Sequence, residues 1–577
     1  MSSTPLASLS AARDWAARHR TVLEPVLIAL LALTLNLAGN DRVSLWDRDE
    51  PRYSTCVREM RARGDWISPT FNAEPRYHKP ILIYWLMRGG VGIWGDNPFG
   101  MRFVSAVAGM GTCLLTWFLG RRIFGPGEAR LAALMLATAP IVMIESKLAT
   151  TDSTLALLLL GCQVCLWELG RRRSRWTAAG FWALLGLATL TKGPVGPALI
   201  AVSGAVSWWW GGPSACWNRL DWRRGLAVFA GVTLPWFIAV GILSRGEFFR
   251  FAIGTQVLSR INTGLEEHGG FPGYYLVTTL GLFHPWSALL PAAALAAWTR
   301  RKLNPAFGFL LGWIVGPLIL LECVQTKLVH YYLPAYPACA LLTAWLARAV
   351  AGAETGLRRW PLGRLAVGLL GGVAVAMTVG LIAAAAVVPG PLRWPCLALG
   401  AIIASGTLLA LARFHRGATL PAATSLIATW AVALALLGAW LLPAMEPYRL
   451  SRIAGERLAT LNRGRDVPPL LMSFQEPSTI YAYGRPVPTV RTWDDFYTQL
   501  DRQGVVLSPI LPKDLLALRK LPHLELEVCE TLAGFNLSKG TNQTLHFTLI
   551  RSKPADAKTG GLSRSETIRR TRQFLGN

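Results

Sequence analysis

The stretch WDRDEPRYSTCVREMRARGDWISPTFNAEPRYHKPILIYW, residues 46–85, is a densely polar loop in an otherwise apolar chain. It lies between two apolar stretches and gathers acidic, basic and aromatic side chains: Asp47, Asp49, Glu50, Arg52, Tyr53, His78 and Lys79. Ionisable groups are costly beside apolar segments and often mark function there. We therefore expect the chemistry of this protein in this loop, with the rest of the chain arranged around it.

The chain around the loop is too apolar for an ordinary soluble protein. Of its 577 residues, 52% are hydrophobic and only 16% are charged, whereas soluble domains carry about 25% charged residues. A helix needs about 20 apolar residues to cross a bilayer core. We predict a mainly α-helical, polytopic membrane protein with about thirteen transmembrane helices. The predicted crossings are 21–39, 99–120, 128–146, 152–169, 176–191, 194–211, 225–243, 274–297, 305–322, 332–350, 363–388, 394–412 and 418–442.

The basic residues between these runs predict the topology, because Lys and Arg in short loops mark the cytoplasmic side. Residues 1–20 are predicted to be a cytoplasmic N-terminus, and clusters such as Arg171 to Arg173 then fall on the cytoplasmic side at every second connection. This alternation favours an odd number of crossings and an external C-terminal domain. These clusters contribute much of the net charge of +25, and their basic residues serve as topology signals and lipid headgroup contacts. We therefore expect a lipid bilayer as partner and no nucleic acid.

The predicted transmembrane domain, 21–442, contains one long external loop, 40–98. Nine Lys or Arg residues in this loop break the charge pattern, and the loop is long enough for the topology rule to weaken. We interpret them as an anion-binding site at the outer membrane face. Residues 81–95 are apolar but too short to span, which predicts a helix lying in the interface.

After Pro443 the pattern becomes that of a small soluble α/β domain, predicted over 443–552. Its predicted strands are 470–474, 504–508, 524–530 and 544–550, and its predicted helices lie near 449–462, 492–503 and 513–520. The polar, basic tail 553–577 is predicted to be disordered.

Three acidic residues are candidates for the chemistry. Asp49 and Glu50 open the long loop, where a carboxylate can accept a proton, orient a nucleophile or bind a divalent cation. The alternative is an interfacial salt-bridge cluster with neighbouring arginines. Asp152, in a short turn between two apolar runs, is expected to cap the following helix and to serve as a second acidic residue facing the loop.

Several cations are predicted on the same outer face. Lys79 immediately precedes the predicted interfacial helix, and Lys192 and Lys327 lie in short external segments. Together with Arg52 and Arg260 these lysines would form a basic ring suited to a phosphate or diphosphate lipid head. The alternative for any single lysine is an anchor that extends its ammonium group to the interface. Convergence on one face favours a binding site.

His268 follows Glu266 and Glu267 in an external loop. A histidine beside two carboxylates is a candidate metal ligand, and the alternative is a solvated loop residue. The sequence predicts no definite cofactor and leaves a divalent metal ion open.

Six motifs then occur in order between residues 46 and 342. They are DEPRYS with GDWISP downstream, HKPILIYW, TTDS, LTKGPVG, EHGGFPGYY followed by FHPW, and TKLVHYYLPAYPACALL. In this order they resemble the bacterial polyprenyl-phosphate-sugar glycosyltransferases of the GT-C type, close to the lipid A aminoarabinose transferase and more distantly to the protein O-mannosyltransferases. The order is far more specific than any single motif.

The resemblance implies a transferase in the bacterial inner membrane that moves a sugar from an undecaprenyl-phosphate carrier to a periplasmic-face acceptor. Lipid A is the first expectation, and a protein or another glycan is the alternative. It implies that Asp49 is the catalytic carboxylate, with Glu50 and Asp152 in support. The implied ligands of the donor phosphate are Arg52, Lys79, Arg260 and Lys327, and the implied pocket residues are Tyr53, His78, His268 and Tyr332.

One departure concerns the sugar and the metal. Aminoarabinose transferases tend to carry Glu before the Lys-Pro pair, where this chain has His78. The resemblance therefore leaves open whether the sugar is aminoarabinose and whether His78 and His268 hold a metal ion. The rival class is a transporter or flippase, which predicts internal repeats and polar residues near the midplane. The chain shows no repeat, and its charges gather at one face.

Overall fold

The computed structural model describes residues 20–252, 254, 270–351, 361–463 and 467–553. The chain divides into two compact units. We call Met1–Arg42 with Tyr77–Ala444 the helical unit, and Val43–Arg76 with Met445–Asn577 the sheet unit. The loop predicted over 40–98 is thus divided between the units, since most of its acidic part belongs with the C-terminal segment.

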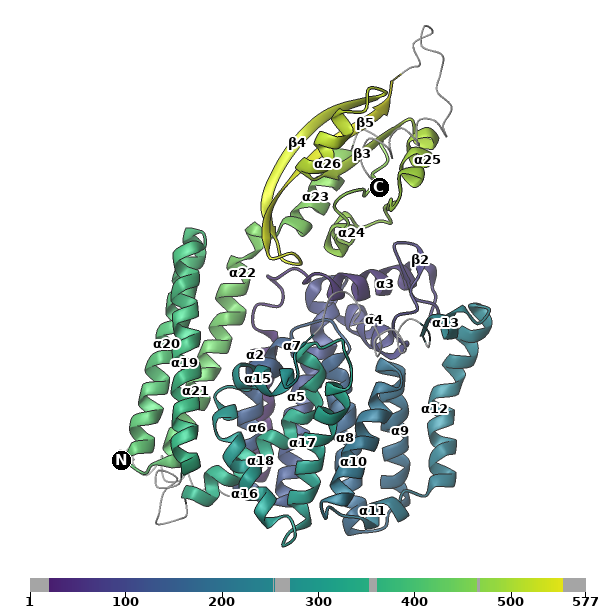
Figure 1. The fold of residues 1–577 in the computed structure, drawn as a ribbon. Helices are drawn as coiled ribbons and strands as arrows, with labels where there is room; N and C mark the ends of the chain where they lie inside the picture. The colour runs from purple at the N-terminus through teal and green to yellow at the C-terminus, as the bar shows by residue number, and fades with distance from the viewer. Residues whose placement is uncertain (1–19, 253, 255–269, 352–360, 464–466, 554–577) are drawn as a thin grey trace, which may run out of the picture. The chain divides into compact units, whose positions relative to one another are not determined.

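The helical unit consists of helices of very different lengths. In chain order (Figure 1) they are α2 (Arg20–Leu37), α4 (Leu82–Trp94), α5 (Pro98–Ile123), α6 (Pro126–Ala137), α7 (Pro140–Ser146), α8 (Asp152–Arg171), α9 (Arg175–Lys192), α10 (Val195–Trp209), α11 (Ala215–Asn218), α12 (Trp222–Leu243), α13 (Glu247–Arg250), α15 (Tyr274–Leu282), η3 (Trp286–Ala288), α16 (Leu290–Arg300), α17 (Pro305–Glu322), η4 (Val329–Ala335), α18 (Tyr336–Ala351), α19 (Pro361–Val387), α20 (Gly390–His415), α21 (Thr419–Leu436), η6 (Leu437–Leu441) and α22 (Leu442–Ala444).

This is a polytopic membrane protein. Within the described ranges, eight helices are long and apolar enough to cross a membrane, or nine if α6 and α7, bent by 61° at their junction, form one span. Pro140 starts α7, and a proline both lacks the backbone N–H and clashes with the preceding turn, which explains the break. Each predicted crossing coincides with a helix or a broken helix, and the shorter ones include α2 and α10.

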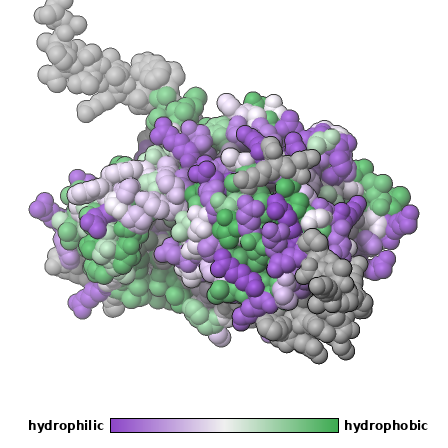
Figure 2. All heavy atoms as spheres, turned by 90° about the horizontal axis from the view of Figure 1, so that it is seen from above, coloured by the Kyte–Doolittle hydropathy of each residue, from purple (hydrophilic) through white to green (hydrophobic). Residues whose placement is uncertain are grey.

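Many apolar side chains face outward from the long helices. Ile242 of α12 is 72% exposed and Val379 of α19 is 59% exposed, as expected for surfaces that contact lipid tails. Figure 2 shows one face of the molecule, on which hydrophilic residues predominate and hydrophobic residues form smaller groups among them.

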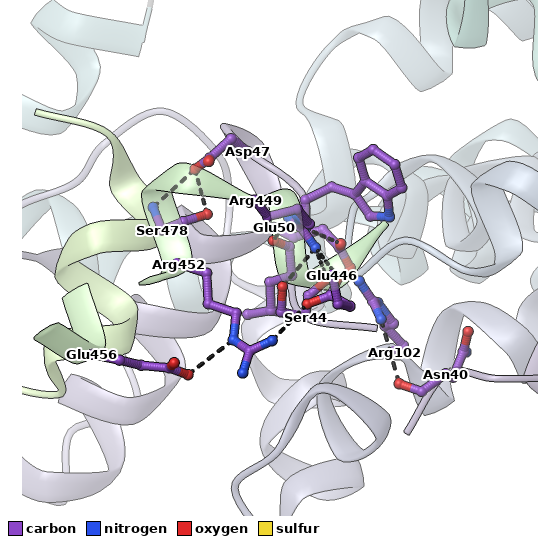
Figure 3. Close-up of polar contacts among 12 residues, drawn as sticks. Asn40, Ser44, Asp47, Glu50, Arg102, Glu446, Arg449, Arg452, Glu456 and Ser478 are labelled. Carbon is purple, nitrogen blue, oxygen red and sulfur yellow. Dashed lines mark hydrogen bonds and ion pairs between the residues drawn. The ribbon is translucent and has the colours of Figure 1, made fainter. Parts of the chain in front are cut away.

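The C-terminal end of α2 is held by two buried cations. Lys147 donates to the carbonyl oxygen of Ala38 and, over 3.1 Å, to Oδ1 of Asn40. Arg102 donates over 3.4 Å to the carbonyl oxygen of Asn40 (Figure 3). The last carbonyls of a helix lack intrahelical partners, and cationic side chains satisfy them favourably. The point where the chain leaves the helical unit is therefore fixed by α5 and by the α7–α8 turn.

Small residues allow α10 and α17 to pack closely. Gly308, Gly312 and Gly316 recur at every fourth position of α17, and a Cβ atom at Gly312 or Gly316 would lie within about 2.6 Å of backbone atoms of Ser207 or Ser203 on α10. Small residues at this spacing let membrane helices approach each other. The glycines thus set the separation of this helix pair.

We predict that Gly312→Leu destabilises the protein by roughly 1–3 kcal/mol, the usual cost of overpacking, because the added side chain meets the backbone of α10. Thermal unfolding of the purified protein in detergent measures this. Gly368→Leu on α19 is the matched control, since nothing lies within 4 Å of a Cβ atom at that position. Equal effects of the two substitutions would contradict the close-packing account.

The sheet unit is a small α/β structure. Its elements are α3 (Asp49–Arg63), β1 (Thr70–Phe71), β2 (Glu74–Pro75), η7 (Glu446–Tyr448), α23 (Leu450–Asn462), α24 (Pro477–Tyr483), α25 (Trp493–Gln503), β3 (Val505–Ile510), α26 (Pro512–Arg519), β4 (Leu524–Asn536) and β5 (Thr541–Ser552). The last three strands form an antiparallel sheet in the order β3-β5-β4. Alternate residues of β3 enter different cores: Leu507 packs with α23, whereas Val506 packs with α25 and α26. Helices therefore cover both faces.

The predicted strand at 470–474 is wrong. Leu470 and Leu471 are buried as an inner strand would be, but the backbone there makes only isolated bridges, Pro469 to Leu507 and Leu471 to Thr489. Pro468 and Pro469 precede the segment, and a proline has no N–H to donate to a ladder. The burial pattern of a strand is present without regular pairing.

Candidate donor site and acidic loop

The acidic loop, which we define as residues 43–50, leads into α3. Asp49 and Glu50 occupy the first turn of α3, and Arg61 and Arg63 occupy its last turn, so charges at both ends complement the helix dipole. Gly64 ends the helix in the left-handed conformation with φ of 66°, which glycine adopts without a steric penalty. The sequence thus fixes the helix start at the two acidic residues.

The two acidic residues have different surroundings. The side chain of Asp49 is 58% exposed, and its Oδ1 lies 3.6 Å from Nη1 of Arg52. Glu50 is buried and accepts a hydrogen bond of 2.7 Å from the backbone N–H of Trp46. The carboxylate of Asp49 is therefore accessible to a reactant, whereas the carboxylate of Glu50 stabilises the turn before Asp49. Tyr53 is buried within α3, with the guanidinium of Arg76 6.0 Å from its ring centroid.

Asp47 is the third carboxylate of the loop. Its Oδ1 accepts hydrogen bonds from the backbone N–H (2.9 Å) and the hydroxyl of Ser478 (Figure 3). Burial nevertheless raises the pKa of Asp47 above its ordinary value of 3.8, with a further contribution from the nearby charge of Glu476. The ionised form is held by Ser478 but is costly to keep in this environment.

The raised pKa of Asp47 predicts a pH-dependent stability. Because the folded protein holds this proton to a higher pH than the unfolded chain, the contribution of Asp47 to stability decreases as pH rises through its folded pKa. We expect Asp47→Asn to match or exceed the native protein in unfolding temperature at neutral pH and to lose this advantage below about pH 4. Asp47→Ala, which lacks the acceptor, should unfold earlier at both pH values. A pH-independent difference between Asn and Asp would contradict the prediction.

The helical unit contains a cavity of about 650 Å³ with a polar end and apolar walls. Its volume lies within the usual range for small-molecule sites. The polar lining residues are Tyr77, His78, Lys79, Asp152, Thr189, Lys192 and Tyr331. The walls include the aromatic residues Phe229, Phe237, Phe248 and Phe249, and the aliphatic residues Leu155, Val195, Leu199, Leu320, Leu321 and Val324. A ligand with a charged head and a hydrocarbon tail matches this division.

A buried ion pair lies at the polar end of the cavity. Nζ of Lys192 is 2.5 Å from Oδ1 of Asp152, and both side chains are less than 10% exposed. Nε2 of His330 lies 3.9 Å from Oδ2 of Asp152, and its Nδ1 lies 3.8 Å from Oε1 of Glu145. Lys192 also lies 4.5 Å from the ring centroid of Tyr331.

The expected capping role of Asp152 is wrong. Thr151 occupies the cap position of α8, Asp152 is the first residue of the helix, and no side chain accepts the capping hydrogen bond. The carboxylate of Asp152 pairs with Lys192 instead, because an unpaired buried carboxylate would cost far more than an unmade cap. The predicted acidic residue is therefore at a polar site, held by a partner from α9.

The remaining predicted site residues differ from one another in burial and in contacts. Lys79 and His78 line the cavity, with Lys79 half-buried and His78 exposed. Lys327 is buried, forms an ion pair with Glu322 and donates to the carbonyl oxygen of Phe271. Tyr332 is buried and donates over 2.9 Å to the carbonyl oxygen of Ile314.

Two predicted residues, Arg260 and His268, lie outside the described residues. Within the described ranges, no group of three or more His, Cys, Asp or Glu residues is placed to hold a metal ion. His78 contacts Phe251 instead, with ring centroids 4.8 Å apart.

Two residues near this ion pair, His330 and Glu145, were not among the predicted site residues, and Lys192 was predicted as a member of the basic ring but not as the partner of Asp152. In the sequence, all three are titratable residues in short external segments, a signal they share with interfacial anchors. A cation and an acid separated by forty positions, as Lys192 and Asp152 are, show no local pattern.

We predict that Lys192→Met destabilises the protein by roughly 3–5 kcal/mol, because it leaves the buried carboxylate of Asp152 without its nearest cation. The double variant Asp152→Asn/Lys192→Met should recover most of that loss, since it removes both charges. A double-mutant cycle compares the thermal unfolding of the native protein, Lys192→Met, Asp152→Asn and the double variant. A double variant as unstable as Lys192→Met would contradict the pairing.

Comparison with known proteins shows which family and which solved structures this chain is similar to. Residues 78–240 match the family described as dolichyl-phosphate-mannose-protein mannosyltransferase. A solved structure of ArnT from Cupriavidus metallidurans bound to undecaprenyl phosphate superimposes with a TM-score of 0.74 at 20% identity, covering 92% of this chain and 98% of that one. The chain has the fold of this transferase. The archaeal oligosaccharyltransferase AglB from Archaeoglobus fulgidus is more distant, with a TM-score of 0.50 at 12% identity, over 86% of this chain and 70% of that one.

The sequence relatives agree. A protein of Edwardsiella ictaluri named undecaprenyl phosphate-alpha-4-amino-4-deoxy-L-arabinose arabinosyl transferase is 32% identical over 58% of this chain and 61% of its own length. A protein of Pseudomonas aeruginosa with the same name is 33% identical over 52% of this chain and 55% of its own length. The matched part spans less than two thirds of these relatives. The resemblance to the GT-C glycosyltransferases, first indicated by six motifs, is confirmed.

Proposed function

We propose that this protein is a membrane glycosyltransferase that moves a sugar from an undecaprenyl-phosphate carrier to lipid A. The observation that carries the proposal is the cavity, with Lys79 and Lys192 at one end and aromatic and aliphatic walls beyond. A polyprenyl phosphate has this same division between an anionic head and a hydrocarbon tail. The relatives named as undecaprenyl phosphate-alpha-4-amino-4-deoxy-L-arabinose arabinosyl transferases and the ArnT structure bound to undecaprenyl phosphate support the donor class.

The residues take distinct roles in this reaction. Lys79 and Lys192 attract the donor phosphate and stabilise its growing charge as the sugar leaves. Asp152 keeps Lys192 in place through their ion pair. Arg52, Arg260 and Lys327 are retained as phosphate ligands; Lys327 would first have to exchange its contact with Glu322.

Asp49 is proposed as the catalytic carboxylate, because it is the exposed acid of the loop. With a hydroxyl acceptor it acts as general base and removes the proton as the new glycosidic bond forms. With a lipid A phosphate as acceptor, the nucleophile is already anionic, and the same carboxylate orients it. Glu50 supports Asp49 through its hydrogen bond with the backbone of Trp46.

We also propose thirteen crossings of the bacterial inner membrane, with the shorter apolar helices α2, α9 and α10 counted among them. The N-terminus is then cytoplasmic, and the residues after Met445 are periplasmic. The alternating clusters of arginine in the short connections support this orientation.

A protein acceptor is the second candidate. The match of residues 78–240 to the mannosyltransferase family favours it. Mass spectrometry of lipid A and of periplasmic glycoproteins, from cells with and without this protein, distinguishes the two acceptors. If neither lipid A nor the periplasmic proteins carry an additional sugar when this protein is present, the proposed function is contradicted.

We predict that Asp49→Asn lowers transfer from a polyprenyl-phosphate donor in purified membranes by roughly 10²–10⁴-fold, the usual contribution of a general base.

Lys79→Ala should mainly raise the KM for the donor, because it removes a phosphate ligand. Asp501→Asn, at an exposed position of α25, and Arg88→Ala, which lies outside the cavity lining, are the controls. Full activity of Asp49→Asn, or an unchanged donor KM in Lys79→Ala, would overturn the respective role.

A further inference from the structure

Arg449 binds the backbone of the acidic loop from the other end of the chain. Its Nη1 donates to the carbonyl oxygen of Ser44 over 2.8 Å and to the hydroxyl of Ser44 over 2.6 Å, and its Nη2 donates to the carbonyl oxygen of Leu45 (Figure 3). Arg449 is only 4% exposed. These contacts join residues 405 positions apart in the sequence.

The charge of Arg449 is balanced within the same unit. Glu446 lies one turn earlier and accepts from Nη1 of Arg449 over 2.7 Å. The guanidinium also lies 5.0 Å from the ring centroid of Trp46. A planar guanidinium presents several donors in a fixed geometry, which a lysine ammonium cannot reproduce. This arrangement suits Arg449 to hold several backbone acceptors at once.

A second set of contacts holds the other half of the loop. The carboxylate of Asp47 accepts from the backbone N–H and the hydroxyl of Ser478. Nε of Arg48 lies 3.5 Å from Oε2 of Glu476. Glu476 is itself buried and accepts from Asn536 over 3.2 Å. Four residues immediately before Asp49 are therefore held by side chains or backbone of the C-terminal segment.

Arg452 provides an internal comparison. It lies on α23 close to Arg449 in sequence and also pairs with Glu446, at 2.9 Å. Its second partner is Glu456, and neither partner belongs to the acidic loop. Arg449 precedes the first residue of α23. Arg452 thus shares the charge and one partner of Arg449 without its contact to residues 44 and 45.

We propose that the C-terminal segment sets the conformation of the acidic loop, with Arg449 and Ser478 as positioning residues for Asp49. The sheet unit is then part of the catalytic machinery, since the loop that carries the reactive carboxylate is shaped by it. The catalytic consequence of this proposal rests on the proposed transferase function, whereas the structural consequence does not.

The test compares Arg449→Ala with Arg452→Ala in the full-length protein. Hydrogen–deuterium exchange should show faster exchange of the backbone amides of residues 44–50 in Arg449→Ala, with β3, β4 and β5 still protected, and no such change in Arg452→Ala. With a polyprenyl-phosphate donor, kcat should fall by about 10²-fold, since a displacement of about 1 Å in a catalytic group has that effect. The KM for the donor should change much less than kcat, because the cavity residues, including Lys79 and Lys192, lie in the helical unit.

Unchanged exchange at residues 44–50, or equal loss of kcat in the two variants, would overturn the proposal. If Arg449→Ala does not fold, Ser478→Ala tests the same loop through Asp47 and should show the same local exchange and kcat loss. Arg449→Lys should fail to restore kcat, because one ammonium cannot reach all the acceptors. A native protein without transfer activity would contradict the proposed function, and the exchange measurement would still decide on the positioning role.

Discussion

A buried charge in this apolar chain needs an oppositely charged or hydrogen-bonding partner close to it. The positions of several helices and turns depend on such pairs. The energy of an unpaired buried ion is large compared with the net stability of a protein. Asp152 is buried with Lys192, Arg449 is buried with Glu446, and Glu24 of α2 pairs with Arg130 over 3.0 Å. Each pair joins different segments or fixes a local turn, so the few charges of the chain act as connections between helices.

The constraint also explains what the sequence could and could not predict. The helices were predictable because a membrane core demands long apolar runs, and the runs of this chain coincide with its helices. The strand at 470–474 failed because burial and backbone pairing are separate requirements. Leu470 and Leu471 meet the first, whereas Pro468 and Pro469 before them have no N–H for a ladder, and only isolated bridges form. The acidic residues of the loop were predictable as a group, whereas the difference between exposed Asp49 and buried Glu50 depends on the contact with Trp46.

The partners of the charged residues were much harder to predict. Lys192 in the sequence LTKGP resembles an interfacial anchor, and only folding brings it to Asp152. Lys327 was expected to bind phosphate because its segment is external, yet Glu322 at the end of α17 already pairs with it. Arg449 gives no sequence signal, since its partners in the loop include backbone carbonyls, which every residue possesses.

The division of the sheet unit between residues 43–76 and the segment after Met445 also has a consequence for biosynthesis. The ribosome completes the acidic loop about 400 residues before it completes Arg449 and Ser478. At about 5–20 residues per second, the loop waits for roughly 20–80 s while the intervening helices enter the membrane. A chain released early therefore has the carboxylates of the loop without the segment that contacts them, so the loop can reach its observed conformation only after residues 449 and 478 have been synthesised.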